Sequence, residues 1–186
     1  IKRLQAVLKA TMGPNSTLRL DLTDSTSVIR IDPVQLEQVI MNLSFNAIQA
    51  MPDGGGLTIR TRQVADNASA SIVVEFEDTG TGMSREVCDQ AFEPFYTNRK
   101  SGGGTGLGLS TVHGIVVRFG GQIELHSTLG VGTRCRIFWP VAESAEFAPQ
   151  PTGSRREELA SLQSARILVV DDHEAILEII SEVLIQ

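Results

Sequence analysis

The sequence predicts an α+β fold, a two-layer sandwich in which helices cover one face of a mixed sheet. Two observations support it: several short segments alternate apolar and polar residues, and longer segments repeat apolar residues at helical spacing. The expected strands are residues 17–22, 28–31, 57–64, 70–76, 122–127 and 133–139, paired as successive hairpins. The expected helices are residues 4–12, 33–51, 84–91 and 105–119.

The composition narrows the class of protein. The chain has 186 residues, 41% of them hydrophobic and 20% charged, which suits one well-cored domain and part of another. A net charge of −6 argues against a nucleic-acid surface. Cys88 and Cys135 stand far apart, so we expect neither a disulfide nor a metal site from them. No apolar run approaches the roughly 18 residues of a membrane span, so we expect a cytoplasmic domain without membrane contact, while membrane anchoring of the full-length protein through other segments stays open.

Two asparagines mark the expected helix 33–51. Asp32 followed by Pro33 is a helix start, and Pro52 with the glycines at 54–56 ends the helix. Asn42 and Asn46 are four residues apart and therefore project from the same face. Because the rest of that helix is largely apolar, we interpret the pair as a ligand-binding face.

Two glycine clusters follow, at residues 78–82 and 102–108, with Phe92-Glu93-Pro94-Phe95-Tyr96 between them. Glycines let backbone N–H groups approach an anion closely, and a helix that begins at such a loop adds the positive end of its dipole. The second cluster leads into the expected helix 105–119 and therefore predicts a phosphate-binding loop.

Taken in order, these motifs resemble the ATP-binding catalytic domain of bacterial sensor histidine kinases. That domain belongs to a superfamily with gyrase, the mismatch-repair ATPase and the heat-shock chaperone ATPase, and the resemblance implies its Bergerat-type fold. It covers about residues 15–140. The segments that match are 42–47 (asparagine box), 78–83 (first glycine box), 92–96 (phenylalanine box), 104–109 (second glycine box) and 130–133 with 139–140 (last hairpin).

The resemblance implies a role for each residue at the base of the nucleotide. The Asp78 carboxylate would accept a hydrogen bond from the adenine amino group. Gly80 and Gly82 would let the backbone pass under the base, and Met83 would line an apolar wall. Thr133 occupies the position of a family hydroxyl near adenine, although a strand threonine without that role is the alternative.

It also implies roles at the phosphates. Asn46 would be the Mg²⁺ ligand, with Asn42 one turn earlier facing the phosphates or a metal-bound water. Residues 84–104 would form a lid that includes Phe95. Arg99 stands where the family has lysine and Lys100 follows it, so which cation contacts phosphate stays open. The loop 102–108 would wrap the β- and γ-phosphates. The ATP-binding residues expected in this segment are Gly104, Thr105, Gly106, Leu107, Gly108 and Leu109.

The resemblance divides the chain into four parts. We expect residues 1–14 to connect to a dimerisation domain, 15–141 to be the catalytic domain, 142–164 to be a linker and 165–186 to begin a response-regulator receiver domain. In the last part an apolar strand pattern ends in Asp171 and Asp172, the family's Mg²⁺ ligands. The receiver's phosphate-accepting aspartate would lie beyond Gln186, so this stub should be inactive.

The function implied is ATP-dependent phosphorylation of a histidine in a dimerisation domain outside this chain, followed by relay to receiver aspartates of the same protein or of a response regulator. His113, His126 and His173 do not match the acceptor, so the chain alone should not autophosphorylate. The alternative is a clamp ATPase of the gyrase, repair or chaperone type. Those enzymes have a glutamate base where Asn42 stands, and Glu37, nine residues before Asn46, falls on the opposite helix face. A docking module without catalysis is a third reading.

Overall fold

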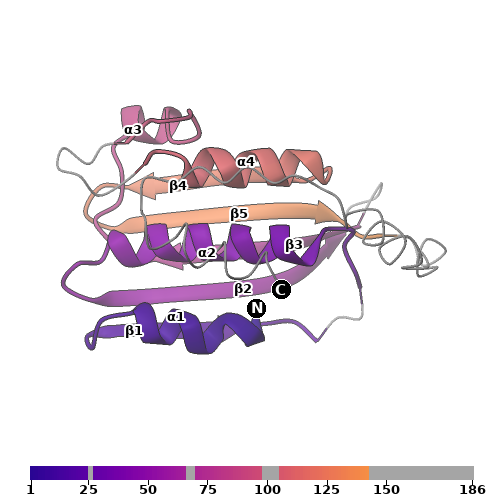
Figure 1. Ribbon diagram of the computed structural model, residues 1–186, viewed down its shortest axis with the longest axis horizontal. Coiled ribbons are helices and arrows are strands. Elements are labelled where there is room, and N and C mark those ends of the chain that lie inside the picture. The colour runs from indigo at the N-terminus through magenta and orange to yellow at the C-terminus, as the bar shows by residue number, and fades with distance from the viewer. Residues whose placement is uncertain (25–26, 66–69, 98–104, 143–186) are drawn as a thin grey trace, which may run out of the picture. The chain divides into compact units, whose positions relative to one another are not determined.

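The computed structural model describes residues 1–24, 27–65, 70–97 and 105–142, and these contain a five-stranded mixed sheet. The strand order is β1-β2-β3-β5-β4, with β1 parallel to β2 and the other neighbours antiparallel (Figure 1). The strands are β1 (Ser16–Asp21), β2 (Gly55–Ala65), β3 (Ala70–Asp78), β4 (Gln122–Thr128) and β5 (Gly132–Pro140). The predicted mixed sheet is therefore confirmed.

The predicted helices are present with small differences in their ends. A 3₁₀ turn η1 (Lys2–Leu4) precedes α1 (Gln5–Thr11), and α2 (Pro33–Gln49), α3 (Arg85–Asp89) and α4 (Gly108–Arg118) follow. Asp32 caps α2 as expected, because its Oδ1 accepts hydrogen bonds from the backbone N–H groups of Val34 at 2.7 Å and Gln35 at 3.2 Å. Helices α1, α2 and α4 lie on one face of the sheet (Figure 1).

The hydrophobic core fills the space between these helices and the sheet. Its side chains come from the apolar face of α2, the inner face of α4 and alternate positions of the central strands, which is the pattern that a two-layer sandwich requires. The largest fully buried side chains are Trp139, Leu8, Ile40, Leu57, Ile59, Ile137, Val39, Val112 and Val116.

One predicted hairpin is wrong. Residues 17–22 and 28–31 do not pair; β1 instead runs parallel to β2, with Leu18 opposite Leu57 and Leu20 opposite Ile59. Ile29 makes a single antiparallel bridge to Val141. Alternation shows which face of a strand is apolar but does not identify its neighbour. Here α2 supplies the crossover that a parallel pair needs, and both strands then direct leucine and isoleucine into the same core.

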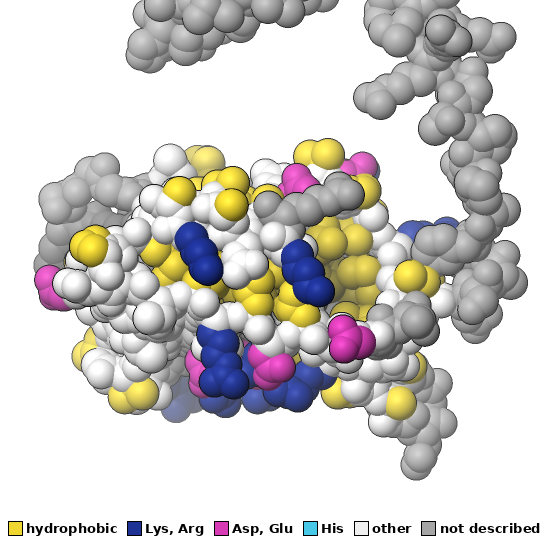
Figure 2. Space-filling view, turned by 90° about the horizontal axis from the view of Figure 1, so that it is seen from below, with side chains coloured by type: hydrophobic (Ala, Val, Ile, Leu, Met, Phe, Trp, Pro, Cys, Tyr) yellow, Lys and Arg dark blue, Asp and Glu magenta, His cyan; other side chains and the backbone are white. Residues whose placement is uncertain are grey.

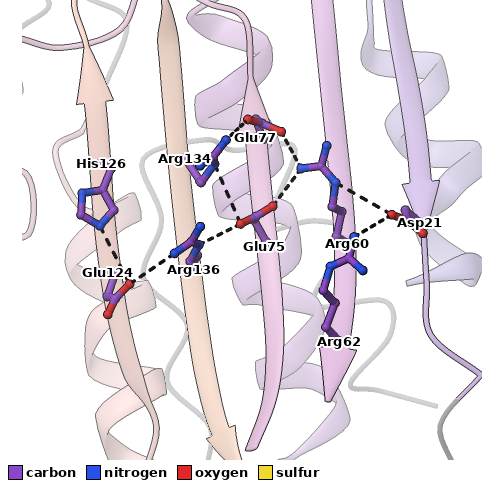
Figure 3. Close-up of polar contacts among 9 residues, drawn as sticks. All are labelled: Asp21, Arg60, Arg62, Glu75, Glu77, Glu124, His126, Arg134 and Arg136. Carbon is purple, nitrogen blue, oxygen red and sulfur yellow. Dashed lines mark hydrogen bonds and ion pairs between the residues drawn. The ribbon is translucent and has the colours of Figure 1, made fainter. Parts of the chain in front are cut away.

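The sheet face opposite the helices carries a network of alternating charges (Figure 3). Glu75 accepts hydrogen bonds from Arg60 and Arg136, each at 2.8 Å, and Glu77 is bound by Arg60 and Arg134. Burial alone would raise the pKa of Glu75, but these arginines outweigh it and hold that pKa below its usual value. The Arg134 and Arg60 hydrogen bonds likewise lower the pKa of Glu77. This network occupies the sheet face that the helices leave open.

The edge at β1 is exposed in a different way. Seen from the side of β1 and α1, hydrophobic areas alternate with basic side chains (Figure 2). Val7 of α1 is 48% exposed, whereas Leu18 and Leu20 of β1 are partly buried against the core.

Within the described ranges, no helix has the length and apolar character that crossing a bilayer requires. The predicted receiver start at 165–186, and the linker apart from Ala142, lie outside the described residues.

Candidate functional site

A cavity of about 530 Å³ lies between α2, the start of α4, the ends of β3, β4 and β5, and the segment that contains α3. It brings together most of the residues that the sequence singles out, from four separate motifs. Those lining it are Asn42, Asn46, Asp78, Gly82, Met83, Thr105, Gly106, Gly108, Leu109 and Thr133. Arg99, Lys100 and Gly104 fall outside the described residues, as do Asp171 and Asp172.

Asp78 is fixed at one end of the cavity by the backbone around it. Its Oδ1 accepts hydrogen bonds from the N–H groups of Gly80 at 2.8 Å and Thr133 at 3.3 Å. Within the described part of the chain, Oδ2 is therefore the oxygen left for a ligand. Burial raises the pKa of Asp78 above its usual value; the two N–H groups oppose that rise, and the charge of Glu77 adds to it. The result is a partly desolvated hydrogen-bond acceptor in a fixed position.

The glycines after Asp78 are required by packing. A Cβ on Gly80 would lie 2.7 Å from Ala50, the C-cap of α2, and Gly80 is not among the residues that line the cavity. Gly82 has φ of 63°, and a Cβ there would overlap the backbone oxygen of Thr128. The first glycine segment is thus held tightly between α2 and the β4–β5 hairpin, which sets the position of Asp78 and Met83.

Ser127 connects the walls of this end of the cavity and was not predicted. Its Oγ accepts a hydrogen bond from the Met83 N–H at 2.8 Å, donates to the Gly132 oxygen at 3.0 Å and lies 2.9 Å from the Thr133 Oγ1. A signal was present in the sequence, because counting back across the predicted hairpin from Thr133 places Ser127 directly opposite it.

At the other end of the cavity, α2 faces the beginning of α4. Asn42 and Asn46 both line the wall, as their spacing predicts. A Cβ placed on Gly108, the first residue of α4, would lie 3.6 Å from the Asn46 Nδ2 and 3.7 Å from its Oδ1. The Asn46 amide therefore lies beside a helix N-terminus, whose unpaired N–H groups and dipole favour an anion. An amide oxygen is also a suitable ligand for Mg²⁺, so the residues present fit that ion together with a phosphate.

The loop before α4 is joined to the segment at 92–97. The Phe95 N–H donates to the Gly106 oxygen at 3.0 Å, and both residues have positive φ, 66° and 67°. The Phe95 side chain is 74% exposed and that of Leu107 is 40% exposed, and neither lines the cavity. Tyr96 and Thr97 line it instead.

The remaining wall is apolar and consists largely of residues that the sequence did not mark. Cys135 belongs to it; burial raises the pKa of its thiol to about 12, which keeps it uncharged. Alternation within β3, β4 and β5 shows that such residues face the core, but it does not show that the core opens to a ligand here. The apolar side chains are Leu43, Phe45, Phe76, Val87, Ala91, Leu125 and Cys135.

Ionisable side chains are scarce in this cavity. Among the described residues that line it, Asp78 is the single carboxylate. Glu37 is exposed and is not part of the wall, as its position on the helix predicts. Nor do the two described histidines belong to the wall: His113 packs against Phe92 with ring centroids 5.4 Å apart, and His126 lies near Glu124 on the open sheet face.

The family of the chain follows from comparison with known proteins. The sequence model of the histidine kinase-, DNA gyrase B- and HSP90-like ATPases matches residues 31–143, which include every strand except β1 and both helices of the cavity. The chain therefore belongs to this family of ATPases.

Relatives with curated names place it within that family. It is 38% identical to the sensor kinase CckA of Brucella abortus over 93% of this chain and 20% of that protein. It is 34% identical to the sensor histidine kinase ZraS of Escherichia coli K12 over 74% of this chain and 28% of that protein. The chain thus spans less than a third of the length of either relative, and what it carries is the ATP-binding catalytic domain of a sensor histidine kinase.

Solved structures agree on the fold. The mycobacterial sensor histidine kinase MprB superposes with a TM-score of 0.61 at 23% identity, covering 75% of this chain and 90% of that one. Full-length ShkA in complex with AMPPNP gives 0.62 at 22% identity, covering 77% of this chain and 30% of that one. At these identities the likeness concerns the arrangement of strands and helices.

Proposed function

We propose that the cavity holds Mg-ATP and presents its γ-phosphate to a histidine of a dimerisation domain outside this chain. The observation that carries the proposal is that the two ends of the cavity differ in their polar groups. A fixed carboxylate, Asp78, stands at one end, and the other end has two neutral amides, Asn42 and Asn46, beside a helix N-terminus with no described carboxylate on the wall there.

The carboxylate end suits an adenine. Its exocyclic amine is a hydrogen-bond donor, and Asp78 Oδ2 is an acceptor whose partner oxygen is already held by two N–H groups. The neighbouring apolar side chains, among them Met83 and Leu125, provide surfaces against which a flat base can pack. Guanine has an oxygen in place of this amine, so the same carboxylate disfavours it.

The amide end suits a triphosphate. The first N–H groups of α4 are directed toward it, and Asn46 offers an oxygen to a cation without adding negative charge. Bound Mg²⁺ would supply charge neutralisation for the phosphate oxygens. Asn42, one turn earlier on the same helix, would hold a phosphate oxygen or a water of that ion. Arg99 or Lys100 would add a positive charge from the lid.

The absence of a described carboxylate at the amide end favours transfer over hydrolysis. Water needs a base to become an effective nucleophile, and an asparagine amide does not accept a proton at neutral pH. A neutral imidazole attacks through its own lone pair and does not need that base. A clamp ATPase, the second candidate function, would need a glutamate at the position of Asn42.

We also propose the larger setting of the domain. Residues 165–186 would begin a receiver with Asp171 and Asp172 at its metal site, and the phosphoryl group would pass to a receiver aspartate in the same protein or in a response regulator. The CckA alignment supports this reading, since it covers 93% of the chain and so reaches beyond residue 143. The domain would act in the cytoplasm on the dimerisation helices of its own homodimer, and residues 1–14 would connect it to those helices.

Phosphoryl transfer to a separate domain tests the proposal. The chain is mixed with the dimerisation domain of its full-length protein and with ATP labelled at the γ-phosphate. We expect a labelled dimerisation domain whose label is lost in acid and kept in base, as a phosphoramidate requires. Label that resists acid, or label on this chain instead, would refute transfer to that histidine.

A further inference from the structure

The hydroxyl groups of Ser127 and Thr133 lie at the end of the cavity that contains Asp78. Their hydrogen bonds determine which polar groups this end presents to a ligand. Ser127 has one proton and two lone pairs, and three partners lie within hydrogen-bonding distance of its Oγ. The Met83 N–H takes one lone pair at 2.8 Å. The Gly132 oxygen, 3.0 Å away, only accepts, so that bond uses the Ser127 proton.

The third contact then has one possible direction. Once Ser127 has given its proton to Gly132, the bond of 2.9 Å between the two hydroxyls must use the proton of Thr133. Thr133 lines the cavity, and with its proton committed it has only lone pairs to offer a ligand. Asp78, its partner across β3 and β5, also offers an acceptor, Oδ2. Asp78 and Thr133 therefore both present hydrogen-bond acceptors at the edge of the cavity beside the base.

We propose that Ser127 is a positioning residue for base selection, because it commits the Thr133 proton and so makes this edge reject purines with a 6-oxo group. The proposal rests on the proposed function, since it assumes that the base lies against Asp78 and Thr133. It adds a repulsive element to the attraction of the carboxylate: a carbonyl at position 6 would meet lone pairs from both side chains, whereas the amine of adenine meets acceptors.

A role of Ser127 in base selection leads to a prediction that a purely structural role does not. In Ser127→Ala the Thr133 hydroxyl loses its acceptor and becomes free to turn its proton toward the ligand. We expect the affinity for Mg-ITP to rise relative to Mg-ATP, narrowing the ratio of their dissociation constants about three- to tenfold, the range of one hydrogen bond. Inosine is the appropriate probe because it has a 6-oxo group and an N1–H where adenosine has an amine and an N1 lone pair, and it lacks the additional 2-amine of guanosine.

Calorimetry with Mg-ATP and Mg-ITP on the whole chain measures this ratio for a set of variants. Thr133→Val removes the hydroxyl at nearly constant shape and should narrow the ratio by itself, whereas Thr133→Ser should keep it. Ser127→Ala combined with Thr133→Val should add nothing beyond Thr133→Val, because the two residues act through one proton. Thr128→Ala removes an exposed hydroxyl from the same strand and should leave the ratio at the parent value.

Two results would overturn the inference: an unchanged ratio in Ser127→Ala, or the same change in the Thr133→Val background. If Ser127→Ala does not fold, Thr133→Val and Thr133→Ser decide the question, since equal ratios in those two would refute it. Failure of the proposed function has a different signature. In that case the parent binds both nucleotides equally, or Asp78→Asn keeps the preference for ATP.

Discussion

Phe95 and Gly106 are joined through their backbones beside the cavity: the Phe95 N–H donates to the Gly106 oxygen at 3.0 Å, and both residues adopt positive φ. A Cβ on Gly106 would overlap the Phe95 backbone. The loop before α4 and the segment at 92–97 are therefore fixed to each other at this point, and glycine is needed at 106 for packing as well as, in the proposed site, for an approaching phosphate.

Gly106→Ala should consequently lower the free energy of unfolding, by about 1–3 kcal/mol, and weaken ATP binding. Urea denaturation of the nucleotide-free chain measures the first effect. Gly114→Ala in the middle of α4 is the matched control: nothing lies within 4 Å of its added Cβ, so it should stabilise the chain by about 0.5–1 kcal/mol. Equal stability of the two variants would contradict the packing role of Gly106.

Gly108→Ala should behave differently from Gly106→Ala. Its methyl group would lie at an ordinary contact distance, 3.6 Å, from the Asn46 amide, so the fold should tolerate it. That methyl would occupy the space between Asn46 and the N-terminus of α4, and we expect weaker Mg-ATP binding with unchanged or higher stability. Calorimetry and a melting curve on the same sample separate the two effects.

Asp78→Asn should lose ATP binding and make the nucleotide-free chain more stable. A raised carboxyl pKa in the folded state means that stability from this group is greatest at low pH and falls as the pH rises past the ordinary aspartate range toward the raised value. The nucleotide-free variant should therefore be more stable than the parent at neutral pH, and the difference should vanish in acid. It should also lose ATP binding, since its amide places a donor at the base. A variant less stable than the parent at pH 7 would refute the burial argument.

Asn46→Ala should remove most of the stabilisation that Mg-ATP gives, with little effect on the nucleotide-free chain, because alanine suits a helix. Thermal melts with and without excess Mg-ATP report the difference. Gln38→Ala, which removes an exposed amide from the same helix, should keep the full shift. If Asn46→Ala also keeps it, Asn46 does not bind the metal–nucleotide complex.

Acid should weaken the charge network on the open sheet face. The pKa values of Glu75 and Glu77 are lowered in the folded state, so their contribution is present above their ordinary pKa and is lost as the pH falls through that value toward the lowered one. Glu75→Gln should lower stability at pH 7 by about 1–2 kcal/mol and flatten the acid limb of the stability curve. Denaturation between neutral and acid pH tests this, ideally in the Asp78→Asn background, because Asp78 contributes with the opposite sign.

Local patterns predicted the helices and the motifs of the site. Asp32 and Pro33 mark the start of α2, and the spacing of Asn42 and Asn46 puts both on the cavity wall. These features depend on neighbours in the sequence, which is why the sequence alone was sufficient for them. The pairing of β1 was not predictable in this way, because a parallel partner lies on the far side of α2 in the chain and alternation carries no information about it.

The site residues that were missed owe their roles to distant contacts. Ser127 matters because it meets Met83 and Thr133 at once, and these come from separate motifs. Tyr96 and Thr97 line the cavity because the hydrogen bond between Phe95 and Gly106 fixes the course of the chain just before them. Gly80 was predicted to let the backbone pass under the base; in the structure it packs against Ala50, the residue that follows α2, and does not line the cavity.

No described carboxylate lines the cavity beside Asn42 and Asn46, and one measurement tests directly whether the cavity nevertheless hydrolyses ATP. The isolated chain is saturated with Mg-ATP, its binding is verified by calorimetry, and phosphate release is followed under the same conditions. We predict tight enough binding to saturate and no appreciable release, because nothing described at the amide end activates water. Steady, rapid release of phosphate that is lost in Asn46→Ala would show that the cavity itself hydrolyses ATP, and would contradict the assignment as a kinase domain.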